Sequence, residues 1–406
     1  DILSIIGDIG GDHAKGYLLD KLLQSNKILL SPILVALKSC GYQSDEKVVS
    51  QVNKVIEQIV KTIIWNLAAI EEIDEQGTGV YVIEALEEEN RDKMDMLFLL
   101  LSLNYEPTSI EKIKDSINTG TVESIGYAIE LLDLFLAEEL KGYLFPLLED
   151  SLIADKLKQI EIYYSRASYS SKEVLIEIIN RDFNYTNSWT KACAILQYGQ
   201  LEKNQLDKSL IACLFNPDKL LAECASEVVF TLDPVLYHES GKRLHSRVKR
   251  EMDKLVASTS TSRSQLLIEK TFLLKKVKGF KELSWQLISE FARLTSKVTL
   301  ASGEILLSKE TEKDTPFYIL LKGVIGVISS GEKIVTIDKP SVISDVLLLD
   351  TDVELTEIKA LTDTVLFQVS QLELFNFLYD YPEFSEVIIA TIDLRLGSKE
   401  SLIDSL

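Results

Sequence analysis

Five carboxylates are concentrated in one short segment, SDVLLLDTDVELTEIKAL at residues 344–361. They are Asp345, Asp350, Asp352, Glu354 and Glu357, and Lys359 is the one base among them. Clustered carboxylates can accept hydrogen bonds from a bound ligand or form an acid–base pair. Apolar and polar residues alternate here, which is typical of two strands joined by a turn. The segment therefore either lines a ligand site or only has the pattern of one.

Other motifs that carry chemistry are absent from the sequence. It contains no GxxxxGK[ST], HExxH, GxSxG or CxxC motif. The glycine cluster GDIGGDHAKG at 7–16 lacks the Lys-Ser/Thr pair and the preceding strand of a phosphate loop, so it indicates a corner between two helices. His13, His238 and His245 have polar neighbours and do not form a ligand set. We expect no catalytic, metal or cofactor site.

The overall charge excludes some classes of partner. A net charge of −20 and a pI near 4.7 argue against a nucleic-acid surface, which needs clustered Lys and Arg. The same charge disfavours stable binding to an anionic membrane. Acidic runs are interpreted as solvated helix faces rather than catalytic pairs, so the chain is predicted not to be an enzyme.

Cysteine usage and hydropathy indicate a cytoplasmic protein. The four cysteines are Cys40, Cys193, Cys213 and Cys224. Three of them fall within apolar helical patterns, which predicts small core residues in a reducing compartment. The longest apolar runs, such as MLFLLL at 96–101, are far shorter than the roughly 18–20 residues that cross a bilayer. The printed sequence is therefore predicted to be soluble.

Helical periodicity extends from residue 1 to about 255. Helices at 206–215 and 221–232 flank the turn NPDK at 216–219, where Pro217 suits the start of the second helix. Further helical units are predicted at 6–23, 29–42, 125–152 and 189–201, with Gly41 and Gly199 as helix stops. Units of about 35–45 residues, each too thin to close a core alone, predict a stacked solenoid.

The charge changes sign around residues 241–281, where most of the concentrated basic residues occur. The small polar segment ASTSTSRSQ at 257–265 lies between two basic stretches and indicates a domain boundary. We interpret the basic helix as a solvated face that pairs with the acidic solenoid. A nucleic-acid or lipid role is the alternative.

After residue 296 the hydrophobic period changes from 3.6 to 2. Short strands are predicted within 297–310, 316–330, 331–339 and 356–370, with turns at Gly303, Gly331 and Pro340, and 371–396 is helical again. The predicted fold class is α+β. It comprises an all-α solenoid at 1–255, a linker at 256–266 and an antiparallel β-roll flanked by helices at 267–406.

Two family resemblances follow from these segments. The helical units resemble HEAT-type repeats over roughly 200 residues. Residues 267–395 resemble the cyclic-nucleotide-binding domain family. The features that carry this second resemblance are the Gly303-Glu304 turn, the strand Phe317-Tyr318-Ile319, and Gly323 in the place of the family's YxxxxG signature. The resemblance implies a β-roll with a ligand cup and leading and closing helices.

In that family one cassette binds the ligand. A Gly-Glu pair opens a short helix whose backbone N–H groups, with a later Arg, hold the cyclic phosphate, and the Glu binds the ribose hydroxyl. The resemblance places Ser344 at the Gly, Asp345 at the Glu, and Glu354 at or next to the Arg. The implied cup positions are Ser344, Asp345, Val346, Glu354, Leu355 and Thr356. Glu354 cannot replace a guanidinium that binds phosphate bidentately, and it repels the anion.

No nearby cation in the sequence compensates for having Glu354 in the place of the family's Arg. There is no Arg from 294 to 394, and residues 299–384 hold 6 Lys against 15 Asp and Glu, a net charge of −9. Lys339 or Lys359 could supply a point charge, but neither has the planar fork of Arg. Steering of an anionic ligand is also unfavourable. We expect no ordinary binding of cyclic nucleotides.

The segment ELLDLFLAEELKGYLFPLLED at 130–150 carries a further resemblance, to bacterial membrane carriers similar to the ATP/ADP-exchanging major-facilitator family. In these carriers HEAT-like repeats and this β module form the cytoplasmic part. The resemblance implies an upstream membrane-transport domain in the same polypeptide and a place at the cytoplasmic face of the inner membrane. The start DILSIIGDIGG, without Met, is expected to be a cut from a longer chain, with processing as the alternative.

Two functions remain open from the sequence. The first is a non-catalytic scaffold and regulatory region, with a protein partner on the solenoid and a β-roll that does not bind cAMP or cGMP. The alternative is a ligand-gated regulator that binds a cyclic nucleotide or another small molecule in the cup. An enzyme would require a polar cleft with perturbed acids.

Overall fold

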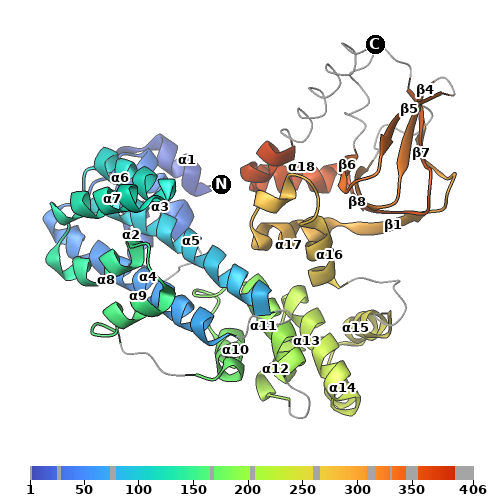
Figure 1. The fold of residues 1–406 in the computed structure, drawn as a ribbon, viewed down its shortest axis with the longest axis horizontal. Coiled ribbons are helices and arrows are strands. Elements are labelled where there is room, and N and C mark those ends of the chain that lie inside the picture. The colour runs from blue at the N-terminus through green and yellow to red at the C-terminus, as the bar shows by residue number, and fades with distance from the viewer. Residues whose placement is uncertain are drawn as a thin grey trace. The chain divides into compact units, whose positions relative to one another are not determined.

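The computed structural model describes residues 2–24, 29–73, 79–164, 169–201, 206–258, 266–308, 316–329, 332–343 and 355–388. The chain divides into two compact units, Asp1–Leu244 and His245–Leu406. The described part of the first unit is helical, and the second contains two antiparallel sheets with helices before and after them (Figure 1). The predicted α+β class is therefore confirmed, whereas the division at 1–255, 256–266 and 267–406 stays a prediction.

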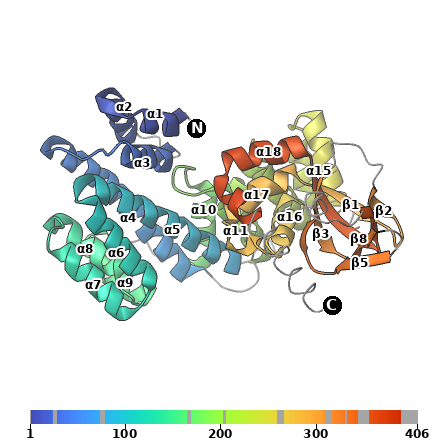
Figure 2. The same ribbon diagram turned by 90° about the horizontal axis from the view of Figure 1, so that it is seen from above.

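The first unit is built around two long helices, α4 and α5, that pack against each other. Its described helices are α1(Ile2–Ile9), α2(Gly11–Leu23), α3(Leu30–Ser39), α4(Glu46–Glu72), α5(Gly79–Asn104), α6(Pro107–Thr119), α7(Val122–Asp133), α8(Glu138–Leu148), α9(Ile153–Ile160), α10(Ser171–Asn180), α11(Ser188–Leu201), α12(Lys208–Cys213), α13(Lys219–Leu232) and α14(Pro234–Gly241). Figure 2 shows α1–α3 on one side of this pair and α6–α9 on the other. The α4–α5 pair is longer than the predicted repeat of 35–45 residues, and the HEAT-like solenoid stays a prediction.

The spacing of apolar residues along α4 explains how this helix packs against several other helices. Val52, Ile56, Ile59, Val60 and Ile63 are buried along it and belong to one core shared by α2–α9. Residues three and four apart lie on one face, so this series forms a broad apolar stripe. Asp45 begins the helix, because its carboxylate accepts hydrogen bonds from the backbone N–H groups of Lys47 and Val48 at 3.0 Å each.

The predicted corner at the glycine cluster is confirmed. Gly10 separates α1 from α2, and both Gly10 and Gly11 have positive φ angles, 64° and 81°. A residue with a Cβ rarely adopts this conformation, so the glycines permit the sharp change of direction. Gly41, with a φ of 61°, likewise follows the end of α3, as the sequence predicts.

Two helix boundaries differ from the predicted ones. Gly199 does not stop its helix, because α11 continues to Leu201. A Cβ at Gly199 would lie 2.8 Å from the Val228 methyl groups, so the glycine serves close packing of α11 on α13. Nor does Pro217 begin α13; the helix starts at Lys219, after Asp218, whose carboxylate accepts from the Leu220 N–H at 2.9 Å. A side-chain cap outweighs proline preference here.

The second unit begins with helices and continues into eight described strands. Its elements are α15(Ser246–Ser258), α16(Leu267–Leu274), η2(Phe280–Glu282), α17(Trp285–Leu294), β1(Ser296–Leu300), β2(Ile305–Ser308), β3(Phe317–Lys322), β4(Ile325–Ser329), β5(Glu332–Ile337), β6(Ser341–Ile343), β7(Leu355–Ala360), β8(Thr364–Val369) and α18(Gln371–Asp380). A further helical segment covers 382–388. The basic stretch after Leu244 is helical in α15, as predicted, while the predicted linker falls mostly at 259–265, outside the described residues.

The eight strands form two four-stranded antiparallel sheets in the orders β1-β8-β3-β6 and β2-β7-β4-β5. Side chains from both sheets share one apolar core, including Leu320 and Leu366 from the first sheet and Ile325 and Ile358 from the second. Buried and less buried residues alternate along parts of β7 and β8, whereas Phe317–Leu320 of β3 and all of β6 are buried. The predicted antiparallel strands are thus confirmed, and they enclose a filled interior.

An aromatic cluster joins the helices before the sheets to those after them. Phe291 of α17 lies 4.5 Å from Phe384 and 5.3 Å from Phe377 of α18, measured between ring centroids. Phe280 of η2 lies 5.2 Å from Phe384. All four rings are buried, and tilted or edge-on pairs at such distances add to the gain from burial. The cluster therefore makes the flanking helices one packed layer.

Candidate functional site

The structure describes only one end of the predicted ligand cup. Ser344, Asp345, Val346 and Glu354 lie outside the described residues. Leu355 and Thr356 begin β7, where Leu355 is paired with Ser329 of β4. The chain leaves the first sheet at Ile343, the end of β6, and enters the second at Leu355. The predicted cassette is therefore the connection between the two sheets.

The described half of the acidic segment separates its apolar and charged residues onto two faces. Ile358 and Ala360 are fully buried in the core between the sheets. Glu357 and Lys359 alternate with them, and the Lys359 ammonium lies 3.4 Å from the Glu357 carboxylate, with a quarter to a third of each side chain exposed. Lys359 therefore lies on the opposite face of β7 from the core and already has an anionic partner.

The interior of the roll is uncharged over its described residues. From residue 296 on, the buried polar side chains in this part of the chain are Ser341 and Thr364, and no described Lys, Arg, Asp or Glu is buried there. Lys339, the other candidate cation, is exposed in the turn before β6. An anionic group entering the described interior would lose its hydration and find no opposite charge.

The turn residues Glu304, Gly323 and Val324 of the roll have structural roles. Glu304 closes its own turn, because its carboxylate accepts from the Ala301 N–H at 2.8 Å. Gly323 has a φ of 105°, and a Cβ there would lie 2.5 Å from the Thr364 hydroxyl. The Val324 N–H donates to the Thr362 hydroxyl at 3.0 Å. The Ser302 N–H donates to the Asp363 carboxylate at 3.1 Å, so the three turns are joined to one another.

The first unit contains a second polar arrangement, which sequence reasoning missed. We call it the polar junction, and it comprises Asn66, Glu89, Asn90, Arg181, Thr190 and Lys191. These side chains come from α4, α5, α11 and the segment after α10. Their interactions connect the long helices to the helices that follow, and they include two charged residues that are only 3% exposed, Glu89 and Lys191.

Glu89 is the centre of one half of the junction. Its Oε1 accepts from the Asn187 N–H and from the Thr190 hydroxyl, both at 2.8 Å. Its Oε2 has no hydrogen-bond partner among the described residues. Burial raises the pKa of Glu89, and the hydrogen bonds and the positive charges of Lys93 and Arg181 oppose this rise. The carboxylate thus fixes the start of α11 against α5.

Arg181 forms the other half of the junction. Its guanidinium stacks on the Trp65 ring at 3.7 Å and donates to the Asn66 side chain at 2.8 Å. Asn66 donates in turn to Asn90 at 2.9 Å. Burial lowers the pKa of Arg181 to about 10, while Glu89 opposes the change. The Lys191 ammonium donates to the carbonyls of Ile179 and Arg181 and so closes the end of α10.

The prediction that acidic runs are solvated faces is wrong for Glu89, which belongs to the run EEEN at 87–90. Its signal in the sequence is faint, because three successive acids on a helix must point in different directions, so one of them can face inward. The Thr190 hydroxyl and the Glu89 carboxylate that accepts from it are both buried, so neither is open to solvent. The junction holds the segment after α10 in place through the contacts of Arg181 and Lys191.

The remaining sequence-predicted chemistry has the expected structural roles. His13, His238 and His245 are exposed, and the described residues contain no group of side chains suited to a metal ion. Cys193, Cys213 and Cys224 are buried and free, as predicted for core residues. Trp189 is fully buried among helices. Across the described ranges, no helix combines the length and the apolar content of a membrane span.

Comparisons with known proteins found similarity to solved structures only. No family model matches the sequence, and no curated protein is significantly similar to it. Solved structures that match include a cyclic nucleotide-binding domain from Methylobacillus flagellatus, at 16% identity over 33% of this chain and 78% of that one, with a TM-score of 0.28. The sensor domain of the transcriptional regulator DNR from Pseudomonas aeruginosa matches at 19% identity over 32% and 95%, with a TM-score of 0.27.

A third match is the N-terminal domain of a transcriptional regulator from Streptomyces coelicolor, at 20% identity over 32% of this chain and 94% of that one, with a TM-score of 0.27. The matches thus cover about a third of this chain. Identities and TM-scores this low carry no statement about what this chain binds. The description of the roll rests on its own strands, turns and core.

Proposed function

We propose that the chain is a non-catalytic regulatory and scaffold protein whose β-roll does not bind cAMP or cGMP in the ordinary way. The observation that carries the proposal is the uncharged interior of the roll, in which no described cation is buried. Lys359 lies on the outer face of β7 and is paired with Glu357. The sequence adds Ser344, Asp345 and Glu354 where the resembled family has Gly, Glu and Arg.

A phosphate diester bound in such a cup needs either a bidentate cation or several free backbone N–H groups. Glu354 stands in the place of the bidentate cation, and its negative charge repels the phosphate. Ser344 replaces the residue that frees the backbone for close approach, since only glycine lacks a Cβ. The roll then serves as a docking or sensing module for something other than a cyclic nucleotide, while the first unit provides the scaffold.

Thermal unfolding tests this proposal. A ligand at about 100 times its Kd stabilises the folded state by about 2.7 kcal/mol, which moves the melting temperature by several degrees. We expect cAMP and cGMP to leave the melting temperature of the chain unchanged. The triple variant S344G/D345E/E354R, which restores the family's three residue types, should show a shift with cAMP. A shift of the unaltered chain that S344A or D345A abolishes would instead support the ligand-gated alternative.

We propose further that the two units are the cytoplasmic part of a membrane carrier, with the helical unit facing a protein partner that is the transport domain of the same polypeptide. The support is the resemblance of residues 130–150, where α7 and α8 lie, to the connecting region of such carriers. An antibody against the chain should detect a larger polypeptide in the membrane fraction of the native cells. Detection of a 45.7 kDa species wholly in the soluble fraction would contradict this proposal.

A further inference from the structure

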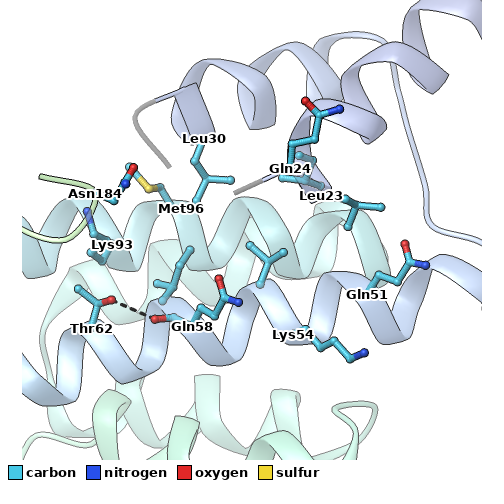
Figure 3. A pocket seen from close by; sticks show the side chains of 13 residues that line it. Leu23, Gln24, Leu30, Gln51, Lys54, Gln58, Thr62, Lys93, Met96 and Asn184 are labelled. Carbon is cyan, nitrogen blue, oxygen red and sulfur yellow. Dashed lines mark hydrogen bonds between the residues drawn. The ribbon is translucent and has the colours of Figure 1, made fainter. Parts of the chain in front are cut away.

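A pocket in the first unit lies between the α2–α3 end and the long helices α4 and α5. It encloses about 280 Å³ and has 13 lining residues. Figure 3 shows Lys93 and Asn184 together at one end, beside Met96 and Leu30, with Gln51 and Lys54 toward the other end. This volume is at the lower limit of the roughly 300–1,000 Å³ common for small-molecule sites. The pocket therefore suits a small occupant.

The charge of the pocket is opposite to that of the chain. Its lining includes two lysines, Lys54 and Lys93, and no Asp or Glu. The chain as a whole carries 63 acidic residues against 43 Lys and Arg. The pocket is thus a local positive site on an acidic protein, which favours an anionic occupant.

Lys93 is the more significant of the two lysines. Its side chain is half-buried, and it forms no ion pair or hydrogen bond with any described residue. The adjacent acid Asp95 is paired instead with Lys114, at 2.6 Å. Glu89 and Asp92 are within electrostatic reach but do not contact it. A partly desolvated ammonium without a close partner gains most from an incoming anion.

The rest of the pocket supplies an apolar wall and neutral hydrogen-bonding groups. Leu30 and Ile59 are buried, and Met96 lies beside Lys93 in Figure 3. The Thr62 hydroxyl donates its hydrogen bond to the Gln58 carbonyl at 3.0 Å, so that hydrogen is not available to a ligand. The side-chain amide of Asn184 forms no hydrogen bond with a described residue, and Asn184 lines the same pocket as Lys93, at the same end in Figure 3. An ammonium, an amide and an apolar wall together fit a carboxylate attached to an apolar body.

We propose that this pocket binds a small organic monocarboxylate, with its carboxylate on Lys93 and Asn184 and its apolar body against Leu30, Ile59 and Met96. The size of the pocket limits that body to about six to ten carbon atoms. The site lies in the helical unit and is independent of the β-roll. It therefore stands whether or not the roll binds a nucleotide.

Isothermal titration of the full chain tests the site with hexanoate, octanoate and benzoate as probes. At least one of these carboxylates should bind at one per chain with a sub-millimolar Kd, and the neutral amide of the same body should bind at least about tenfold more weakly.

Variants of the lysine test where the carboxylate binds. Lys93→Met, which keeps most of the apolar volume of the side chain, should weaken carboxylate binding by about tenfold or more, while Lys93→Arg should keep the affinity within a few-fold. Lys47→Met, an exposed lysine at the start of α4, makes the same change in net charge outside the pocket and should have no effect.

Circular dichroism of each variant establishes that the helices remain folded, so a loss of binding is assigned to the pocket. The proposal is overturned if none of the three carboxylates binds at about 10 mM, well above the expected Kd. It is also overturned if Lys93→Met and Lys47→Met bind equally well, because the carboxylate would then not be on Lys93. Binding of an acidic peptide but of no small carboxylate would likewise overturn it, in favour of a protein-docking groove.

Discussion

The two units of this chain differ in whether their described interiors contain charged side chains. All three charged residues that are buried among the described residues, Glu89, Lys191 and Glu223, belong to the first unit. The described interior of the β-roll is apolar, with Ser341 and Thr364 as its polar exceptions. A buried charge is tolerated only where hydrogen bonds surround it. The helical unit therefore depends on directional contacts at its junction, whereas the roll depends on non-directional packing.

The two units also differ in which of them could bind an anionic ligand. Among the described residues of the roll no Lys or Arg is buried, and Lys339 and Lys322 are exposed on its surface. The helical unit holds Lys93, which has no ion pair or hydrogen bond with a described residue, and the pocket around it. The proposed carboxylate site therefore belongs to the first unit and can be tested independently of the roll.

The largest expected effect tests packing in the second unit. Phe291→Ala removes a fully buried ring from the aromatic cluster of Phe280, Phe377 and Phe384, and should lower the free energy of unfolding of this unit by about 3–5 kcal/mol. Urea unfolding followed by hydrogen-exchange mass spectrometry would measure it for each unit separately. Phe375→Ala, on the same layer but 63% exposed, is the control and should change stability by less than about 0.5 kcal/mol. Equal losses in the two variants would contradict the cluster's role.

The next effect tests the polar junction. Glu89→Ala leaves the buried Asn187 N–H and Thr190 hydroxyl without their acceptor, and should destabilise the first unit by about 2–4 kcal/mol. Glu89→Gln retains an acceptor and should cost less. The measurement is urea unfolding with hydrogen exchange in peptides of α5 and α11. If Glu89→Ala matched the wild type, the junction would not position α11.

The same residue gives the junction a pH dependence with a defined sign. Because burial raises the pKa of Glu89 above its ordinary value of 4.5, the folded state holds this proton where the unfolded state has lost it. Stability from this group is therefore full below pH 4.5 and falls as pH rises through the folded pKa. Measured from pH 4.5 upward, the wild type should lose stability relative to Glu89→Gln. If the stability of the wild type instead rose relative to that of Glu89→Gln as the pH increased, the direction of the pKa shift would be wrong.

A smaller effect distinguishes two helical glycines. Gly199→Ala places a Cβ 2.8 Å from the Val228 methyl groups and should destabilise the first unit by about 1–3 kcal/mol. Val228→Ala in the same chain should recover part of this loss. Gly16→Ala, in α2 with nothing within 4 Å, should instead stabilise by up to about 1 kcal/mol, because alanine favours the helix. Thermal unfolding of the three variants would show whether α11 and α13 are as close as described.

The smallest effect concerns the charged face of β7. The Glu357–Lys359 pair is partly exposed, so its loss in Glu357→Gln should change stability by less than about 0.5 kcal/mol. The measurement is urea unfolding at low and at high salt, and salt should reduce even this difference. A loss comparable to that of Phe291→Ala would mean that this pair is part of the core. The apolar description of the roll would then be wrong.

The sequence was most informative where one periodicity dominates. The apolar spacing predicted helices to Leu232 and beyond, and the period of two predicted the strands around Phe317 and Phe367, because burial on one face imposes these patterns directly. Short β6 was not anticipated, since three residues cannot display an alternation. Gly199 and Pro217 were misassigned because a tertiary contact and a competing Asp218 cap decided those positions.

The candidate sites were predictable to different degrees. The cassette residues around Ser344 and Glu354 came from a family resemblance, and they lie outside the described residues. The junction and the pocket were not predicted, because they bring together residues far apart in the chain. Arg181 and Asn66 are separated by 115 positions, and no local pattern reports such a contact. Lys93 is unusual only when its neighbours in space are known.

Calorimetric titration of the intact chain with cAMP and with cGMP tests the central claim most directly. Such a titration detects binding down to a millimolar Kd. We expect no saturable heat for either nucleotide, because no cation is buried among the described residues of the roll and the sequence has Ser344, Asp345 and Glu354 at the cassette positions. The restored variant S344G/D345E/E354R provides the positive comparison in the same cell. A saturable isotherm of the unaltered chain, at one nucleotide per chain and a micromolar Kd, would contradict the account.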